Sequence, residues 1–252
     1  MYPLLFSIGN IKVFSYGAMV ALGVLIAAML IYRHALLRQL DAEKIVDMIF
    51  WIVFWGLIGG RILYVLINPD IYAKDPLEII KINKGGLVFH GSLIGAIIAA
   101  LVFMKRSKQP LFETLDIIFV YVPLAHAIGR LGCFLNGCCF GKPTRAFSGV
   151  FFPGHYIRVH PTQLYSAFLL LIIFLVLYLC EKRKRFSGQI VCLYLISYGV
   201  MRFSIEFLRD NPAVLGFLTM FQCISIALVL IGLIMYGILK NNRMSDKLET
   251  KT

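Results

Sequence analysis

The sequence has few charged residues and few acidic ones. Only 15% of its 252 residues are Asp, Glu, Lys or Arg, against about 25% in soluble globular domains. Hydrophobic residues make up 60%, and the mean hydropathy is +0.82. A soluble fold of this length cannot bury so much apolar surface, so the composition argues against an ordinary soluble enzyme.

The chain also lacks the sequence patterns that bind common cofactors. It has no phosphate-binding loop, Rossmann fingerprint, serine nucleophile elbow or tandem repeat. We therefore expect no cofactor and no metal. The net charge of +12 does not indicate nucleic-acid binding, because no basic stripe lies on a soluble segment.

Long apolar runs are what the sequence does contain. Each is near the ~20 residues that an α-helix needs to cross the hydrocarbon. They predict an all-α integral membrane protein with about seven transmembrane helices, forming one polytopic domain (1–239) with a short, disordered basic cytoplasmic tail (240–252). The runs are Tyr16–Tyr32, Ile45–Ile67, Leu87–Met104, Leu111–Ile128, Leu164–Cys180, Gln189–Phe207 and Phe217–Leu239.

Basic residues are divided unequally between the two sides of this arrangement. Fourteen lie between spans 1 and 2, after spans 3 and 5 and in the tail, whereas eight lie on the opposite side. The positive-inside rule places the larger group in the cytoplasm. The sequence therefore predicts an outer N-terminus, a cytoplasmic C-terminus and contact with anionic membrane lipids.

The unusual polar residues of the spans share one predicted depth, the outer leaflet. In span 6, Arg202, Glu206 and Arg209 follow at intervals of four and three residues, which puts them on one helix face. A cluster of arginines with one acid has spare positive charge that suits a lipid phosphate, although a purely structural ion pair remains open. The outer-leaflet set is Tyr16, Arg61, His90, Arg130, His160, Gln163, Arg202 and Glu206.

Two further residue types have open interpretations. His90 opens span 3 and is either a general base or a helix-start histidine bonded to a carbonyl, whereas His126 is expected to be structural. Cys133, Cys138 and Cys139 have no known zinc spacing, so we expect them to pack between helices, with a disulfide in the outer turn as the alternative.

Several separated motifs resemble the prolipoprotein diacylglyceryl transferase family. The most specific is GRLGCFLNGCCFG (Gly129–Gly141), which is similar to the family signature and matches it at Arg130, Asn136 and Gly141. The other segments lie in the same order along nearly the whole chain. They are the opening around Tyr16–Gly17, GGRILYVL (Gly59–Leu66), GGLVFHGSLIG (Gly85–Gly95), HPTQLY (His160–Tyr165) and YGVMRFSIEFLRD (Tyr198–Asp210).

The resemblance implies a reaction and a set of roles. A diacylglyceryl group would pass from phosphatidylglycerol to the lipobox cysteine thiol of exported prolipoproteins, in the bacterial inner membrane. His90, Arg130 and Arg202 are expected to be catalytic. Substrate-binding roles are expected for Arg130, Tyr16, Asn136, Glu206, Arg61 and Gly141.

The sequence departs from the familiar form of these motifs at three positions. Cys133 stands where an asparagine is common, whereas Cys138 and Ser166 stand where glutamates are common. Roles of those polar side chains therefore do not transfer. A polytopic transporter and a membrane thiol oxidoreductase that uses the three cysteines are the alternative functions.

Overall fold

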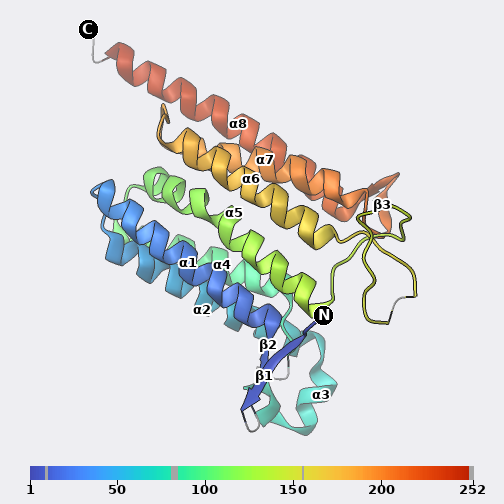
Figure 1. Ribbon diagram of the computed structural model, residues 1–252. Helices are drawn as coiled ribbons and strands as arrows, with labels where there is room; N and C mark the ends of the chain where they lie inside the picture. Colours follow the sequence, from blue (N-terminus) through green and yellow to red (C-terminus); the bar gives the residue numbers. More distant parts are fainter. Residues whose placement is uncertain (9–10, 81–84, 155, 250–252) are drawn as a thin grey trace. The chain divides into compact units, whose positions relative to one another are not determined.

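The computed structural model describes residues 1–8, 11–80, 85–154 and 156–249. Figure 1 shows long helices with short strands and loops between them. The helices are α1 (Ser15–Leu37), α2 (Ala42–Ile67), α3 (Pro69–Lys74), α4 (Phe89–Ser107), α5 (Leu111–Asn136), α6 (Thr162–Glu181), α7 (Gln189–Glu206) and α8 (Met220–Glu249), with a 3₁₀ helix, η1, at Pro76–Ile79. The predicted all-α membrane fold is confirmed.

Six of the helices are long and apolar enough to cross a membrane. They are α1, α2, α4, α5, α6 and the part of α8 from Met220 to Asn242. The seventh predicted span is also a helix, α7, but it is not among these six. Arg202 and Glu206 lower its mean hydropathy, and the same two residues are the ones with predicted functions. The predicted orientation stays a prediction.

Two elements of the structure were not expected from the sequence. Short antiparallel hairpins precede α1 and α8, formed by β1 (Leu4–Ile8) with β2 (Ile11–Phe14) and by β3 (Ala213–Leu215) with β4 (Leu218–Thr219). The predicted disordered tail is instead helical as far as Glu249, because α8 continues beyond its apolar part.

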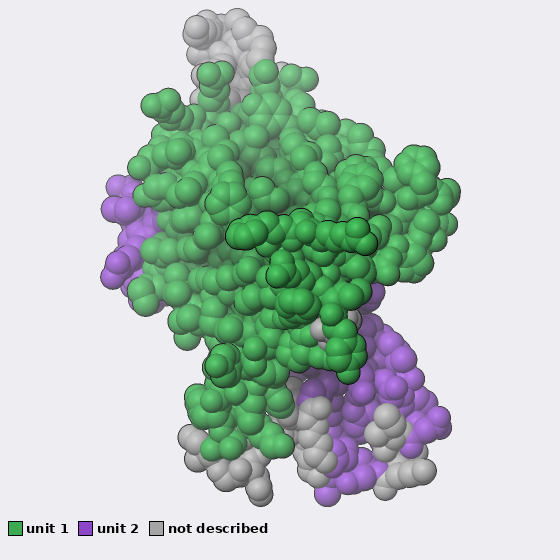
Figure 2. All heavy atoms as spheres, turned by 45° about the vertical axis from the view of Figure 1, so that its right-hand side comes forward, with its two compact units in different colours: residues 1–30, 112–252 green, residues 31–111 purple. Residues whose placement is uncertain are grey.

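The chain divides into two compact units, which are coloured separately in Figure 2. Unit 1 comprises Met1–Leu30 and Phe112–Thr252, and unit 2 comprises Ile31–Leu111. Within unit 1, α7 packs against both α6 and α8. Gly199 allows α7 and α8 to approach closely, since an added Cβ would lie 2.8 Å from the Ser225 carbonyl oxygen.

Unit 2 is built around the pair α2 and α4. Their backbones approach so closely at Gly59 and Gly91 that a Cβ on either would lie within 2.4 Å of the other's carbonyl oxygen. Small residues at a helix crossing are typical of membrane proteins, where close packing holds helices together. The crossing fixes the first turn of α4, which carries His90, against the end of α2, which carries Arg61.

Candidate functional site

Arg130 is held by a histidine one turn earlier on α5. Its Nε donates a hydrogen bond of 3.2 Å to Nε2 of His126, so that nitrogen accepts and carries no proton in this arrangement. Among the residues that the structure describes, the two terminal amino groups of Arg130 have no hydrogen-bond or ion-pair partner. His126 therefore orients the guanidinium, a structural role that was predicted, and leaves its fork of donors available to an anion.

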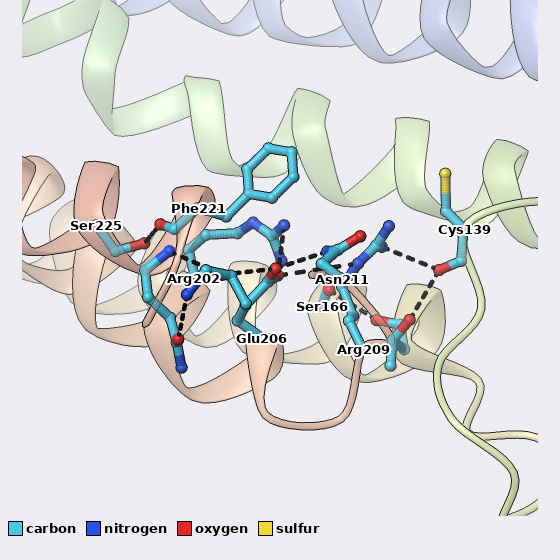
Figure 3. Close-up of polar contacts among 11 residues, drawn as sticks. Cys139, Ser166, Arg202, Glu206, Arg209, Asn211, Phe221 and Ser225 are labelled. Carbon is cyan, nitrogen blue, oxygen red and sulfur yellow. Dashed lines mark hydrogen bonds and ion pairs between the residues drawn. The ribbon is translucent and has the colours of Figure 1, made fainter. Parts of the chain in front are cut away.

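Arg202 and Arg209 both approach the carboxylate of Glu206 (Figure 3), although α7 ends at Glu206 and Arg209 therefore does not lie on the predicted helix face. Arg202 Nη2 lies 2.7 Å from Glu206 Oε2, and Arg209 Nε lies 3.9 Å from the same oxygen. Neither contact has the N–H alignment of a hydrogen bond. The guanidinium of Arg202 also lies over the ring of Phe221, 4.6 Å from its centroid. Two arginines therefore share one carboxylate. Electrostatic attraction to Glu206 holds the Arg202 side chain in place.

Glu206 is itself fixed by neutral donors that the sequence analysis missed. The side chain is 1% exposed, and its Oε1 accepts hydrogen bonds from Asn211 Nδ2 at 2.6 Å and Thr219 Oγ1 at 3.0 Å. Thr219 and Gln222 exchange side-chain to backbone bonds at the start of α8. This reciprocal arrangement is a capping box, and the T-x-x-Q pattern at 219–222 is the sequence signal that could have revealed it.

Contacts within unit 1 bring the α5 and α7 arginines into one region. The ring of His126, which binds Arg130, lies 5.7 Å from the ring of Tyr198, and Tyr198 lies one turn before Arg202 on α7. The two guanidinium groups are close enough to interact electrostatically. Between α1 and α5, a Cβ on Gly132 would lie 3.3 Å from Tyr16 Cα. The structure therefore gathers Tyr16, Arg130, Arg202 and Glu206 in this unit.

The end of the signature is a tightly packed turn. Gly141 donates to the His160 carbonyl at 2.8 Å, and a Cβ on Gly141 would lie 2.2 Å from the carbonyl oxygen of Leu208. No larger residue fits there without moving the segment that follows α7. Asn136 is the last residue of α5 and is half-buried. Gly141 therefore contributes its backbone, and the space left by its missing side chain, to the packing of this turn.

The three signature cysteines meet, which their spacing in the sequence did not predict. Their sulfur atoms all lie within 4.8 Å of one another. All three are free thiols, so the structure contains no disulfide here. Hydrogen bonds from the thiols of Cys133 and Cys138, together with the charges of Arg209 and Arg130, lower the pKa of the Cys139 thiol.

Backbone carbonyls of the same turn are held from α6 and from the segment that follows α7. Thr162 Oγ1 donates to the Cys139 carbonyl at 2.8 Å, and Arg209 Nη1 donates to the same oxygen at 3.2 Å. The buried amide of Gln163 donates to the Cys138 carbonyl. The turn is therefore fixed on both sides, and Gln163, predicted only as an outer-leaflet polar residue, positions it.

Unit 2 contains the two remaining predicted site residues. Arg61 is buried, and its guanidinium donates to the carbonyl oxygens of Glu78, Ile79, Gly85 and Gly86 at 2.5–3.1 Å. It thus holds the segment before α4, and its predicted contact with substrate stays a prediction. His90 is exposed in the first turn of α4, where a ring nitrogen can reach a ligand.

A comparison with known families agrees with this geometry. The family model described as "Prolipoprotein diacylglyceryl transferase" matches residues 3–238. The chain belongs to this family.

Curated relatives cover nearly the same length. A protein of Clostridium tetani named "Phosphatidylglycerol--prolipoprotein diacylglyceryl transferase" is 36% identical over 94% of this chain and 98% of its own. Proteins of the same name from Finegoldia magna (36% identical, 91% of this chain, 92% of its own) and a Wolbachia of Culex pipiens (35%, 97% of both) are also similar. Membership of this transferase family decides against the transporter and the thiol oxidoreductase.

Proposed function

We propose that this protein transfers the diacylglyceryl group of phosphatidylglycerol to the lipobox cysteine of exported prolipoproteins, the first step of lipoprotein maturation. The reaction takes place at the outer face of the bacterial inner membrane. The substrate thiolate forms a C–S bond with the glyceryl carbon, the C–O bond to phosphate breaks, and glycerol phosphate leaves. The thiol proton passes to a base.

The residue roles rest on one observation, the excess of positive charge in unit 1. Arg202 and Arg209 pair with a single buried carboxylate, that of Glu206, and Arg130 lies near enough to Arg202 to interact with it electrostatically. The phosphate ester of the lipid supplies the missing negative charge, and its charge grows as the C–O bond breaks, when fixed donors stabilise it most. Arg130 and Arg202 bind the phosphate, and Glu206 orients Arg202.

The remaining predicted residues have supporting roles in this proposal. His90 is the base that takes the thiol proton or the residue that positions that base. Tyr16 and Asn136 donate hydrogen bonds to the lipid head group. Gly141 allows the turn after α5 to pack, and Arg61 holds the loop that leads to His90. No metal or other cofactor takes part in this scheme.

The test is transfer to a defined peptide. The purified protein is incubated with phosphatidylglycerol vesicles and a lipobox peptide, and mass spectrometry follows the peptide. A diacylglyceryl mass increment on cysteine is expected. A peptide with serine in place of that cysteine, and vesicles of phosphatidylethanolamine alone, are the controls. A lack of product with phosphatidylglycerol, or equal product with both lipids, contradicts the proposal.

A further inference from the structure

The three sulfur atoms at the end of α5 have the geometry of a ligand set. Cys133 lies in the last two turns of the helix, and Cys138 and Cys139 follow the turn at Gly137. All three sulfurs lie within 4.8 Å of one another. Around a metal ion with metal–sulfur bonds of about 2.3 Å, three thiolates lie roughly 4 Å apart, so little movement would close the set.

An unusual backbone brings the two adjacent cysteines to the same side. Cys139 has φ +64°, the left-handed region, as does Gly137 at φ +74°. A non-glycine residue seldom adopts this conformation, and residues that do so are concentrated at functional sites. In an extended chain two successive side chains point to opposite faces. Here both sulfurs instead approach that of Cys133.

Surrounding groups hold the backbone carbonyls of this turn, and Cys138 Sγ itself donates to the Cys133 carbonyl at 3.6 Å. The carbonyl of Cys139 is bound by Thr162 and Arg209, and that of Cys138 by Gln163. Figure 3 shows the Cys139 sulfur pointing away from its bonded carbonyl oxygen. Cys139 is exposed, Cys138 is half-buried and Cys133 is buried, so an ion has a path to the group from one side.

We propose that Cys133, Cys138 and Cys139 form a three-sulfur binding site for one Cu(I) ion. Thiolates are soft ligands that select Cu(I), zinc and iron–sulfur clusters. Structural zinc sites are almost always closed by four protein ligands, and among the described residues no histidine, carboxylate or fourth cysteine joins this group. Cu(I) is stable with three sulfur ligands in a plane.

Positive charge near the sulfurs favours their binding an ion as thiolates. Binding releases three thiol protons to solvent and leaves a complex of charge −2, one positive ion with three thiolates. Two arginines lie beside it. Arg130 precedes Cys133 by three residues on the same face of α5, and Arg209 donates to the Cys139 carbonyl at 3.2 Å. These positive charges reduce the electrostatic cost of bringing three thiolates together.

The experiment measures Cu(I) binding to the full-length protein in detergent. Anaerobic, reduced protein competes with the chromophoric chelator bicinchoninate for Cu(I), and binding is followed by loss of the chelator complex and by thiolate-to-copper charge-transfer absorption. One tightly held equivalent per chain is expected, together with a raised melting temperature. Cys139→Ser and, separately, Cys138→Ser should weaken binding by more than the ~10–100-fold typical of losing an outer-shell partner.

Matched controls separate this site from adventitious binding. Cys180 and Cys223 are also half-buried free thiols but lie outside the group, so Cys180→Ser and Cys223→Ser should bind Cu(I) like the original protein. Equal binding by Cys139→Ser and Cys180→Ser overturns the proposal. So does a reduced protein that takes up zinc but not Cu(I), or one whose signature cysteines reoxidise to a disulfide and bind no ion. None of these outcomes depends on transferase activity.

Discussion

At the residue scale, the shape of the Arg130 side chain matters as much as its charge. Its Nε donates to His126 at 3.2 Å, which leaves the two terminal amino groups to bind an anion. A planar pair of donors matches two phosphate oxygens, whereas an ammonium offers one point of charge. The hydrogen bond to His126 orients the guanidinium group. The two terminal amino groups would in turn set the geometry of a bound phosphate.

Arg130→Lys should therefore damage activity although it keeps the charge. Loss of a donor aimed at developing charge typically lowers turnover by ~10²–10³, and a similar loss is expected here in transfer to a lipobox peptide. Arg145→Lys, on the exposed loop after the signature, is the matched control and should keep its rate. A near-normal rate for Arg130→Lys would show that the guanidinium does not bind the phosphate.

Thr219 allows the role of Glu206 to be tested without touching the ion pair. Thr219→Val removes the hydroxyl that donates to Glu206 at 3.0 Å and accepts from the Gln222 N–H, whereas Thr219→Ser keeps both bonds. Loss of one partner of a buried polar group costs about 1–3 kcal/mol. We expect Thr219→Val to lower kcat and the melting temperature, and Thr219→Ser to restore kcat.

The two variants also distinguish positioning from simple stability. If Glu206 orients Arg202 in the transition state, kcat of Thr219→Val falls at temperatures where the protein remains folded, and KM for the peptide changes little. A variant with a lower melting temperature and an unchanged kcat would show that the Thr219 contact only stabilises the start of α8.

The proposed role of His90 predicts a pH-dependent defect. A cysteine thiol ionises unaided near its ordinary pKa of about 8.5, so a base matters most below that value. His90→Gln should slow peptide transfer strongly at about pH 6 to 7 and less at about pH 9.5. Arg130→Lys is the comparison, because its defect should be similar across the range. An equal loss at every pH for His90→Gln would identify a positioning residue instead.

At the element scale, a carboxylate on α5 caps the start of α7. Asp116 is fully buried, and its two oxygens accept from the backbone N–H groups of Gly188, Ile190 and Val191 at 2.9–3.2 Å. Lys184 lies 3.4 Å from the same group. The first N–H groups of a helix have no partner within it, so this long-range cap fixes where α7 begins and how α5 lies beside it.

Asp116→Asn should therefore destabilise the helix packing of unit 1. The amide group introduces donors where the backbone already donates, and an unsatisfied buried group costs about 1–3 kcal/mol. The apparent melting temperature in detergent should fall. Glu113→Gln, an exposed carboxylate on the same helix, should have little effect. Equal melting temperatures for the two variants would mean that the cap contributes nothing measurable.

At the scale of the whole molecule, orientation in the membrane decides which substrates can reach the site. In the proposed function the lipoprotein precursor reaches the enzyme from the outer face, so the arginines of α5 and α7 are expected to lie near that face. The predicted orientation rests on the unequal distribution of basic residues. It places the loop between α5 and α6 outside and the loop between α6 and α7 in the cytoplasm.

Single cysteines in a cysteine-free background test this orientation. Arg145 and Arg183 are both exposed in the structure and lie in the α5–α6 and α6–α7 loops. In intact cells, a membrane-impermeant maleimide should label Arg145→Cys and not Arg183→Cys, whereas both should react after the membrane is permeabilised. The reverse pattern would invert the topology and remove the basis for an outer-face reaction.

The sequence alone determined the membrane class and the helices, and it supplied the arginines proposed for the site. An apolar run is a feature of neighbouring residues, and its length multiplied by the helical rise per residue shows whether it can cross the membrane. The positions of the spans could therefore be predicted. The spacing of Arg202 and Glu206 fixed a shared helix face, and the structure confirms their ion pair. Arg209 lies beyond the end of α7 at Glu206 and not on that face, yet it still approaches the same carboxylate.

Only the tertiary structure decided which groups the site residues bind. Thr219 reaches Glu206 because a hairpin and a cap set the start of α8, and the three cysteines meet because Gly137 and Cys139 have left-handed backbones. Neither result follows from spacing along the chain. Turn conformation and contacts between distant segments depend on the packing of the whole unit, whereas helix periodicity depends only on neighbouring residues.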